Sequence, residues 1–212
     1  MFTTSVIINK RYSVHLTRIF ILLVLVPLFI SFDPAAQTQI LHYDVLRNNK
    51  VIGAIKAVKR VHSQVTEFNV ESDVNFDMLI DYHIHSVMRA AFNGEQLKES
   101  SLLRKVNGKE KTNTQIVWQL DKYLIKDKSS TVTFGEKIKF TTACLMNIEP
   151  LHATKIFSEN FKQFIPVKEI KPHTYELQLP DGNRNIYKYE NGICVWASVE
   201  TTLSGAQFRL KK

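Results

Sequence analysis

The sequence contains few of the residues on which several protein classes depend. Its 212 residues include two cysteines, six prolines and seven glycines. Two cysteines exclude a disulfide-dense scaffold and permit one bridge at most, between Cys144 and Cys194. The alternative is two separate buried thiols that act as small apolar side chains. The apolar share of 44% is ordinary for a globular protein and is sufficient for a hydrophobic core.

The sequence also lacks the short motifs of the common enzyme classes. It has no Gly-x-Ser-x-Gly turn, no glycine-rich phosphate loop and no recognisable Cys–His signature. The formal net charge is +8, but no run of five or six like charges occurs. Nucleic-acid binding is not expected, because no basic patch is interleaved with aromatic residues. We expect a protein without a cofactor that is not an enzyme.

The first 36 residues follow the order of a secretory signal peptide. Three basic residues precede an apolar run over residues 19–30, and the small residues Ala35 and Ala36 follow it. The run is shorter than the ~20 residues that a membrane-crossing helix needs. We therefore expect an exported protein, periplasmic or secreted, with a signal peptide over residues 1–36 and no transmembrane segment in the mature chain. The alternative is a leader that stays uncleaved as an anchor.

Beyond the leader, apolar and polar residues alternate with a period of two. Alternation over residues 66–76 and 80–92 predicts long strands with one buried face. Four of the seven glycines follow Asn or Asp, and such pairs supply the positive φ angles of hairpin turns. The pattern predicts strands at residues 39–47, 51–61, 65–76, 79–92, 95–106, 111–119, 122–127, 131–140, 173–179, 184–190, 193–202 and 206–210.

These strands predict an all-β fold in a single domain over residues 37–212. Adjacent hairpins make an antiparallel meander, and so many strands must curl, close or split into layers. We expect a strongly curved sheet or an open barrel. Residues 141–165 break the alternation, and the apolar spacing there suits a short helix or packed loop. The fold class therefore includes one short helical or irregular insertion near residues 150–165.

A trio of polar residues on one strand is a candidate metal site. Asp81, His83 and His85 are spaced two apart, so they project from the same face of the strand. A His-x-His pair with a carboxylate can bind zinc or another divalent metal. The alternative is that these residues simply form the solvent-facing side of the strand.

A second candidate lies in the insertion. Glu149 and Glu159, with His152 between them, carry groups suited to ligand binding or to acid–base hydrolysis. The alternative is that Pro150 ends a strand and Glu159 lies on a polar face.

The order of several short landmarks resembles a known family. The landmarks are Tyr43-Asp44-Val45, Asn49-Lys50-Val51-Ile52-Gly53, Phe92-Asn93-Gly94, Ile148-Glu149-Pro150, Ile156-Phe157-Ser158-Glu159, Leu179-Pro180-Asp181-Gly182 and Tyr187-Lys188-Tyr189-Glu190-Asn191-Gly192. They resemble the DUF6134 family of exported proteins of unknown function, and more distantly the DUF3108 group of periplasmic β proteins. The resemblance implies a secreted, curved β-sheet and assigns no catalytic residue.

The 13 Phe, seven Tyr and two Trp residues have the spacing of core positions in strands. On a curved sheet they also suit a concave, apolar binding face. Our first hypothesis is an exported, non-enzymatic protein that binds an apolar ligand, a lipid or another envelope component on that face. The alternatives are a structural or interaction module with a fully packed core, and a hydrolase that uses Glu149, His152 and Glu159. The sequence leaves the oligomeric state open.

Overall fold

The computed structural model describes residues 36–77, 81–200 and 205–212. The chain divides into two compact units, Met1–Asp33 and Pro34–Lys212, and the fold described below is that of the second. The predicted signal peptide over residues 1–36 lies outside the described residues except for Ala36. Among the described residues, no helix is both long and apolar enough to cross a membrane.

The described residues form fourteen strands in one antiparallel sheet. The strands are β1 (Gln37–Arg47), β2 (Lys50–His62), β3 (Val65–Asp77), β4 (Asp81–Asn93), β5 (Gln96–Val106), β6 (Lys109–Gln119), β7 (Lys122–Lys126), β8 (Thr131–Phe134), β9 (Lys155–Ser158), β10 (Gln163–Lys171), β11 (Thr174–Gln178), β12 (Arg184–Glu190), β13 (Ile193–Val199) and β14 (Ala206–Leu210). Their order in the sheet is β8-β7-β6-β5-β4-β3-β2-β1-β14-β13-β12-β11-β10-β9. Two meanders are thus joined where β1 pairs with β14.

The hairpin turns form where the sequence predicts them. Asn48 and Asn49, between β1 and β2, have φ angles of 49° and 61°. Asn191 and Gly192, between β12 and β13, have φ angles of 52° and 75°. Two consecutive residues with positive φ make the tight turn whose twist matches that of antiparallel strands. The local chemistry of the turns therefore determines which strands are neighbours.

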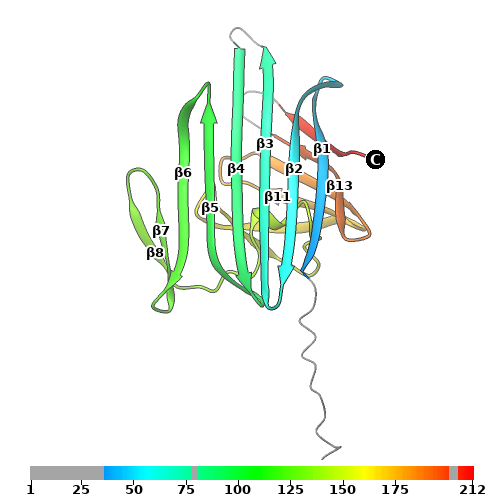
Figure 1. The fold of residues 1–212 in the computed structure, drawn as a ribbon. Coiled ribbons are helices and arrows are strands. Elements are labelled where there is room, and N and C mark those ends of the chain that lie inside the picture. Colours follow the sequence, from blue (N-terminus) through cyan, green and yellow to red (C-terminus); the bar gives the residue numbers. More distant parts are fainter. Residues whose placement is uncertain (1–35, 78–80, 201–204) are drawn as a thin grey trace, which may run out of the picture. The chain divides into compact units, whose positions relative to one another are not determined.

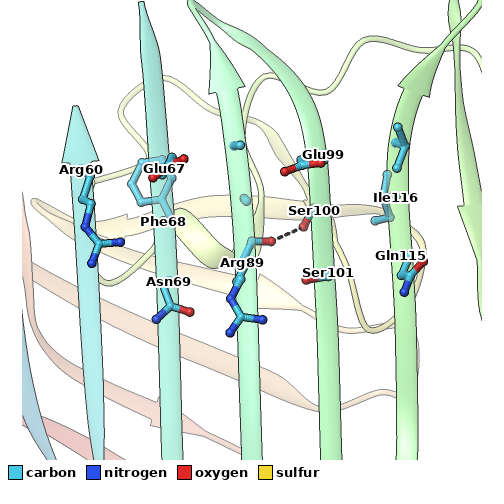
Figure 2. Close-up of a pocket in the computed structure, with 13 residues that line it drawn as sticks. Arg60, Glu67, Phe68, Asn69, Arg89, Glu99, Ser100, Ser101, Gln115 and Ile116 are labelled. Carbon is cyan, nitrogen blue, oxygen red and sulfur yellow. Dashed lines mark hydrogen bonds between the residues drawn. The ribbon is translucent and has the colours of Figure 1, made fainter. Parts of the chain in front are cut away.

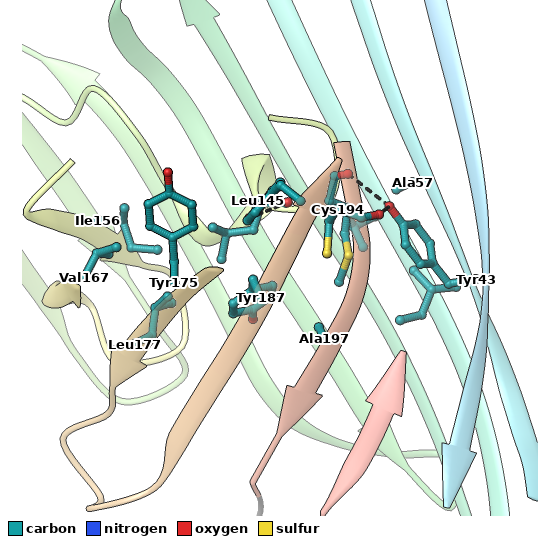
Figure 3. Packing of buried hydrophobic residues seen from close by; sticks show 14 of the residues in the cluster. Tyr43, Ala57, Leu145, Ile156, Val167, Tyr175, Leu177, Tyr187, Cys194 and Ala197 are labelled. Carbon is teal, nitrogen blue, oxygen red and sulfur yellow. Dashed lines mark hydrogen bonds between the residues drawn. The ribbon is translucent and has the colours of Figure 1, made fainter. Parts of the chain in front are cut away.

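The two meanders pack against each other. Figure 1 shows the long strands β1–β6 side by side, with shorter C-terminal strands such as β11 and β13 crossing behind them. One buried cluster joins Tyr43 and Ala57 of the first meander to Leu177 and Tyr187 of the second (Figure 3). The Tyr43 hydroxyl lies 3.0 Å from the carbonyl oxygen of Met146 and 2.8 Å from that of Cys194. The concave side of the sheet is therefore the core.

The edge strands β8 and β9 meet through side chains. Their backbones are not paired with each other in the described part of the chain. The Phe134 ring of β8 lies 5.5 Å from the Phe157 ring of β9 and 5.7 Å from the Phe164 ring of β10. Lys162 and Asp127 form an ion pair nearby. The sheet is thus an open barrel, and the prediction of an all-β fold with an open, curved sheet is confirmed.

The insertion differs from the expectation in its local structure. It contains a short 3-10 helix, η1 (Thr142–Cys144), and then the strands β9 and β10 rather than a helix. Ile156, Phe157 and Ser158 of β9 are all buried. A strand covered on both faces loses the alternation that marks a half-buried strand, and its apolar run is easily read as a helix.

The two cysteines are not bridged. Both are free and buried, and they belong to different core clusters, Cys144 with Phe157 and Cys194 with Tyr43. Burial raises the pKa of each thiol to about 12. A thiol with such a pKa is a poor nucleophile, so both cysteines act as small apolar side chains here.

Candidate functional site

A cavity of about 390 Å³ lies on the concave side of the sheet, between the two meanders. We call it the concave cavity. Its apolar wall is formed by side chains from both meanders, among them Ile55, Val70, Met88, Leu102, Leu145, Ile165, Leu177, Tyr187 and Phe208. Arg104, Asn160, Asn183 and Glu200 contribute polar atoms to the same wall. The size is that of a small-molecule site, and the wall combines apolar side chains with polar ones, which also include Ser72, Ser86, Thr142, Ser158, Asp181 and Asn185.

Arg104 is the unusual member of this wall. On β5 it lies in phase with the buried residues Ser100 and Leu102, so it points to the inner face. Its Nη1 donates a hydrogen bond to Asn160 Oδ1 at 3.4 Å, and it forms no ion pair with any described carboxylate. Burial lowers the pKa of Arg104 below its ordinary value, although a guanidinium stays charged near neutral pH. Asp181 and Glu200 line the same cavity, and Glu200 is paired with Arg184. No ion pair joins either carboxylate to Arg104, so the cavity carries a partly desolvated positive charge that is not neutralised by a described ion pair.

Glu159, which directly follows β9, has hydrogen-bond partners within the protein for both of its carboxyl oxygens. It is fully buried, and its Oε1 lies 2.8 Å from Ser100 Oγ while its Oε2 contacts Thr142 Oγ1. Burial raises the pKa of Glu159, which favours the neutral acid. The Ser100 hydroxyl also lies 2.8 Å from the carbonyl oxygen of Arg89, which accepts its single proton. The protonated Glu159 then donates a hydrogen bond to the Ser100 hydroxyl, so the polar groups of this network have their partners within the protein.

Glu149 belongs to a third network. Its buried carboxylate accepts hydrogen bonds from the Tyr175 hydroxyl at 2.8 Å and from His173 Nδ1 at 2.9 Å. The interaction with Glu149 and burial raise the pKa of Tyr175, burial being the larger cause. His152 instead lines a separate groove near Leu151. Glu149, His152 and Glu159 are therefore not brought together into one acid–base site.

The predicted metal trio is also rearranged. Asp73 of β3 takes the place expected for Asp81: His83 Nε2 lies 3.0 Å and His85 Nδ1 3.4 Å from Asp73 Oδ2. The hydrogen bond from His83 is the largest cause that lowers the pKa of Asp73. The reason is register, because Asp73 lies directly across from His85 on the adjacent strand.

Asp81 instead uses its backbone carbonyl, which accepts a hydrogen bond from Asn107 Nδ2 at 2.9 Å. Over the ranges that the structure describes, no group of three His, Cys, Asp or Glu residues is arranged to hold a metal ion. The metal-site prediction for Asp81, His83 and His85 is therefore not supported.

The sequence pattern predicts a strand over residues 95–106 but does not single out Arg104 as a site residue. A charged residue in phase with apolar residues on a strand is the signal that would have identified it. Asn160, its partner, lies in a loop and gives no such signal.

Comparison with known proteins extends the fold assignment. None of the curated proteins compared matches the chain. A solved structure titled as a β-barrel-like protein of domain of unknown function DUF1849, from Brucella abortus, has a TM-score of 0.50 and 15% sequence identity. The match covers 82% of this chain and 95% of that chain, and it shows a shared fold alone. The model of a domain of unknown function, DUF6134, matches residues 43–211, and the chain therefore belongs to the DUF6134 family.

Proposed function

We propose that this chain is an exported binding protein that holds an apolar ligand with one anionic group in the concave cavity. The carboxylate or phosphate of the ligand pairs with Arg104, and its apolar part lies against the side chains of both meanders. A lipid or a lipid-like envelope component has this chemistry. Arg104 carries the proposal, because it is a charged group beside the apolar part of the concave cavity without a described carboxylate within ion-pair distance.

Two energetic terms support this reading. Transfer of each methylene group of a ligand from water to an apolar wall contributes about 0.8 kcal/mol. Hydrogen bonds to a charged group contribute about 1.5–3 kcal/mol each, and arginine binds carboxylate and phosphate in a two-pronged geometry. A ligand with both features would use the whole wall of the concave cavity.

Export is the second part of the proposal. It is supported by the signal-peptide order of residues 1–36, with its basic, apolar and small-residue segments. A periplasmic or secreted location would give the protein access to the lipids and other components of the envelope.

A comparison of dodecanoate with dodecanol tests the binding proposal by isothermal calorimetry. We expect the wild-type protein to bind dodecanoate about 10- to 100-fold more tightly than dodecanol, because only the acid pairs with Arg104. In Arg104→Met this preference should disappear while the affinity for dodecanol stays within about twofold. Lys56→Met is the matched control, since it removes an exposed cation from the outer face.

Two outcomes would count against the proposal. Equal affinity of the wild-type protein for the acid and the alcohol would remove the role of Arg104. Failure to bind either compound would favour an interaction module with a packed core instead.

A further inference from the structure

We propose a second binding site, on the outer face of the sheet, for an acidic saccharide. A hollow of about 540 Å³ lies on this face across β2–β6, and we call it the outer hollow. The residues on which the argument rests are Arg60, Glu67, Asn69, Arg89, Glu99 and Ser101. The outer hollow is distinct from the concave cavity, because the side chains of these six residues project from the opposite side of the strands and none of them lines the concave cavity.

The strand register builds the outer hollow. Asn69, Arg89 and Ser101 are directly opposite one another on β3, β4 and β5. Glu67 and Glu99 lie in the neighbouring row, on either side of Ala91. The small side chains Ala91 and Ser101 leave the depression between longer neighbours. Arg60 lies in this second row as well, directly opposite Glu67, so residues of both charges line the outer hollow.

Figure 2 shows how the side chains lie in these rows. Asn69 lies between Arg60 and Arg89, and both guanidinium groups extend toward its row. Glu67 and Glu99 lie in the next row, on the two strands that flank β4. The guanidinium groups therefore lie near Asn69, and the two carboxylates lie on either side of Ala91.

The polar groups of the outer hollow are not paired with one another. Arg60 lies directly across from Glu67 on the adjacent strand. Within the described residues, however, the salt bridges include neither of these two residues, nor Arg89 or Glu99. The Asn69 Oδ1 atom is buried and has no hydrogen-bond partner among the described residues. Buried polar atoms in native proteins are nearly always hydrogen-bonded, so Asn69 is the polar group beside the outer hollow whose hydrogen bonding the described residues leave incomplete.

The mixture of groups selects the class of ligand. Two arginines disfavour a cation, and the two nearby carboxylates disfavour a compact, highly charged anion such as phosphate. Hydroxyl groups both donate and accept hydrogen bonds. A hydroxyl-rich ligand can therefore donate to Asn69 Oδ1 and the glutamates and accept from the arginines. If each sugar unit of the ligand also carries a carboxylate, that carboxylate can form a bidentate pair with an arginine. A uronic-acid saccharide has this combination.

The test measures binding of trigalacturonate, maltotriose and inorganic sulfate to the purified protein by calorimetry. Trigalacturonate and maltotriose have the same length, but only the former is acidic. We expect trigalacturonate to bind at least about 10-fold more tightly than either control, as loss of a charged hydrogen-bond pair predicts. Comparable binding of maltotriose, or competition by sulfate at equal concentration, would overturn the proposal.

Variants of exposed residues locate the site. Arg89→Ala should weaken trigalacturonate binding about 10-fold or more, whereas Lys56→Ala should leave it within about twofold. Lys56 is exposed on β2 outside the outer hollow, so both variants remove one positive charge from the same face. Equal losses in the two variants would mean attraction by net charge alone. Arg104→Met should have no effect, which separates this proposal from the one for the concave cavity.

Asn69→Leu provides a second readout. It removes the unpartnered acceptor, so we expect a higher Tm together with loss of trigalacturonate binding. A higher Tm with unchanged binding would show that Asn69 takes no part in the site and would contradict the proposal.

Discussion

Glu159 and Arg104 are both ionisable residues in the interior of the same fold. They differ in the number of hydrogen-bond partners that the protein provides for them. Glu159 is enclosed, and Ser100 and Thr142 satisfy both of its oxygens. Arg104 faces the concave cavity and has one long hydrogen bond, to Asn160. A polar group whose partners all lie within the protein is explained by the fold. For a polar group without such partners, the missing hydrogen bonds must come from a molecule outside the chain.

The largest expected effect on the free energy of unfolding comes from substitution of Glu159. Glu159→Ala leaves a void and removes one hydrogen-bond partner from each of the buried hydroxyls of Ser100 and Thr142, so the free energy of unfolding should fall by about 2–4 kcal/mol. Glu159→Gln keeps the shape and the hydrogen-bonding capacity, and its cost should stay below about 1 kcal/mol. Urea unfolding followed by tryptophan fluorescence measures both. A Glu159→Gln variant as unstable as Glu159→Ala would mean that the negative charge itself is needed.

The next effect concerns pH. Burial raises the pKa of Glu159 above its ordinary value of 4.5. Folding therefore takes up a proton between 4.5 and the raised value, and this contribution to stability is complete below pH 4.5 and is lost as the pH rises through the folded pKa. The free energy of unfolding should fall by at most about 1.4 kcal/mol per pH unit in that window.

The pH slope is isolated by subtracting the curve for Glu159→Gln from that for the wild type. The remaining titrating groups are the same in both proteins, so they cancel. Parallel curves above pH 4.5 would show that Glu159 has no raised pKa in the folded protein.

The smallest effect on stability is expected for Arg104. Arg104→Met removes a desolvated charge without a strong partner and fills the same space with an apolar side chain. The free energy of unfolding should stay the same or rise by up to about 1 kcal/mol. Thermal unfolding of the variant without ligand checks this. A loss of more than about 2 kcal/mol would place Arg104 in the same structural class as Glu159.

Much of the fold could be predicted from local sequence. The alternation around Phe68 and the turn at Asn191-Gly192 each determine structure through nearest neighbours, so strands such as β3 and β12 lie where expected. The strands β9 and β10 could not be recognised in this way. Ile156 and Phe157 are buried on both faces of β9, and only the packing of distant segments creates that environment.

The candidate sites were less predictable, because they depend on which residues meet across strands. Sequence spacing groups His83 with Asp81, whereas the register of β3 and β4 places Asp73 beside His83 and His85. The same limit applies to Glu149, which meets His173 through the tertiary fold. Neighbours along the chain are visible in a sequence, and neighbours across a sheet are not.

The pairing of β1 with β14 has a consequence for the order of folding. The first and last strands of the sheet are hydrogen-bonded neighbours, with Tyr43 opposite Leu210. Contacts between residues so far apart in sequence form slowly, because the entropy of closing the chain is lost before the contact is gained. The backbone of β1 cannot be paired on that side until β14 has been synthesised. A growing chain therefore keeps one edge of β1 open while the rest of both meanders is made.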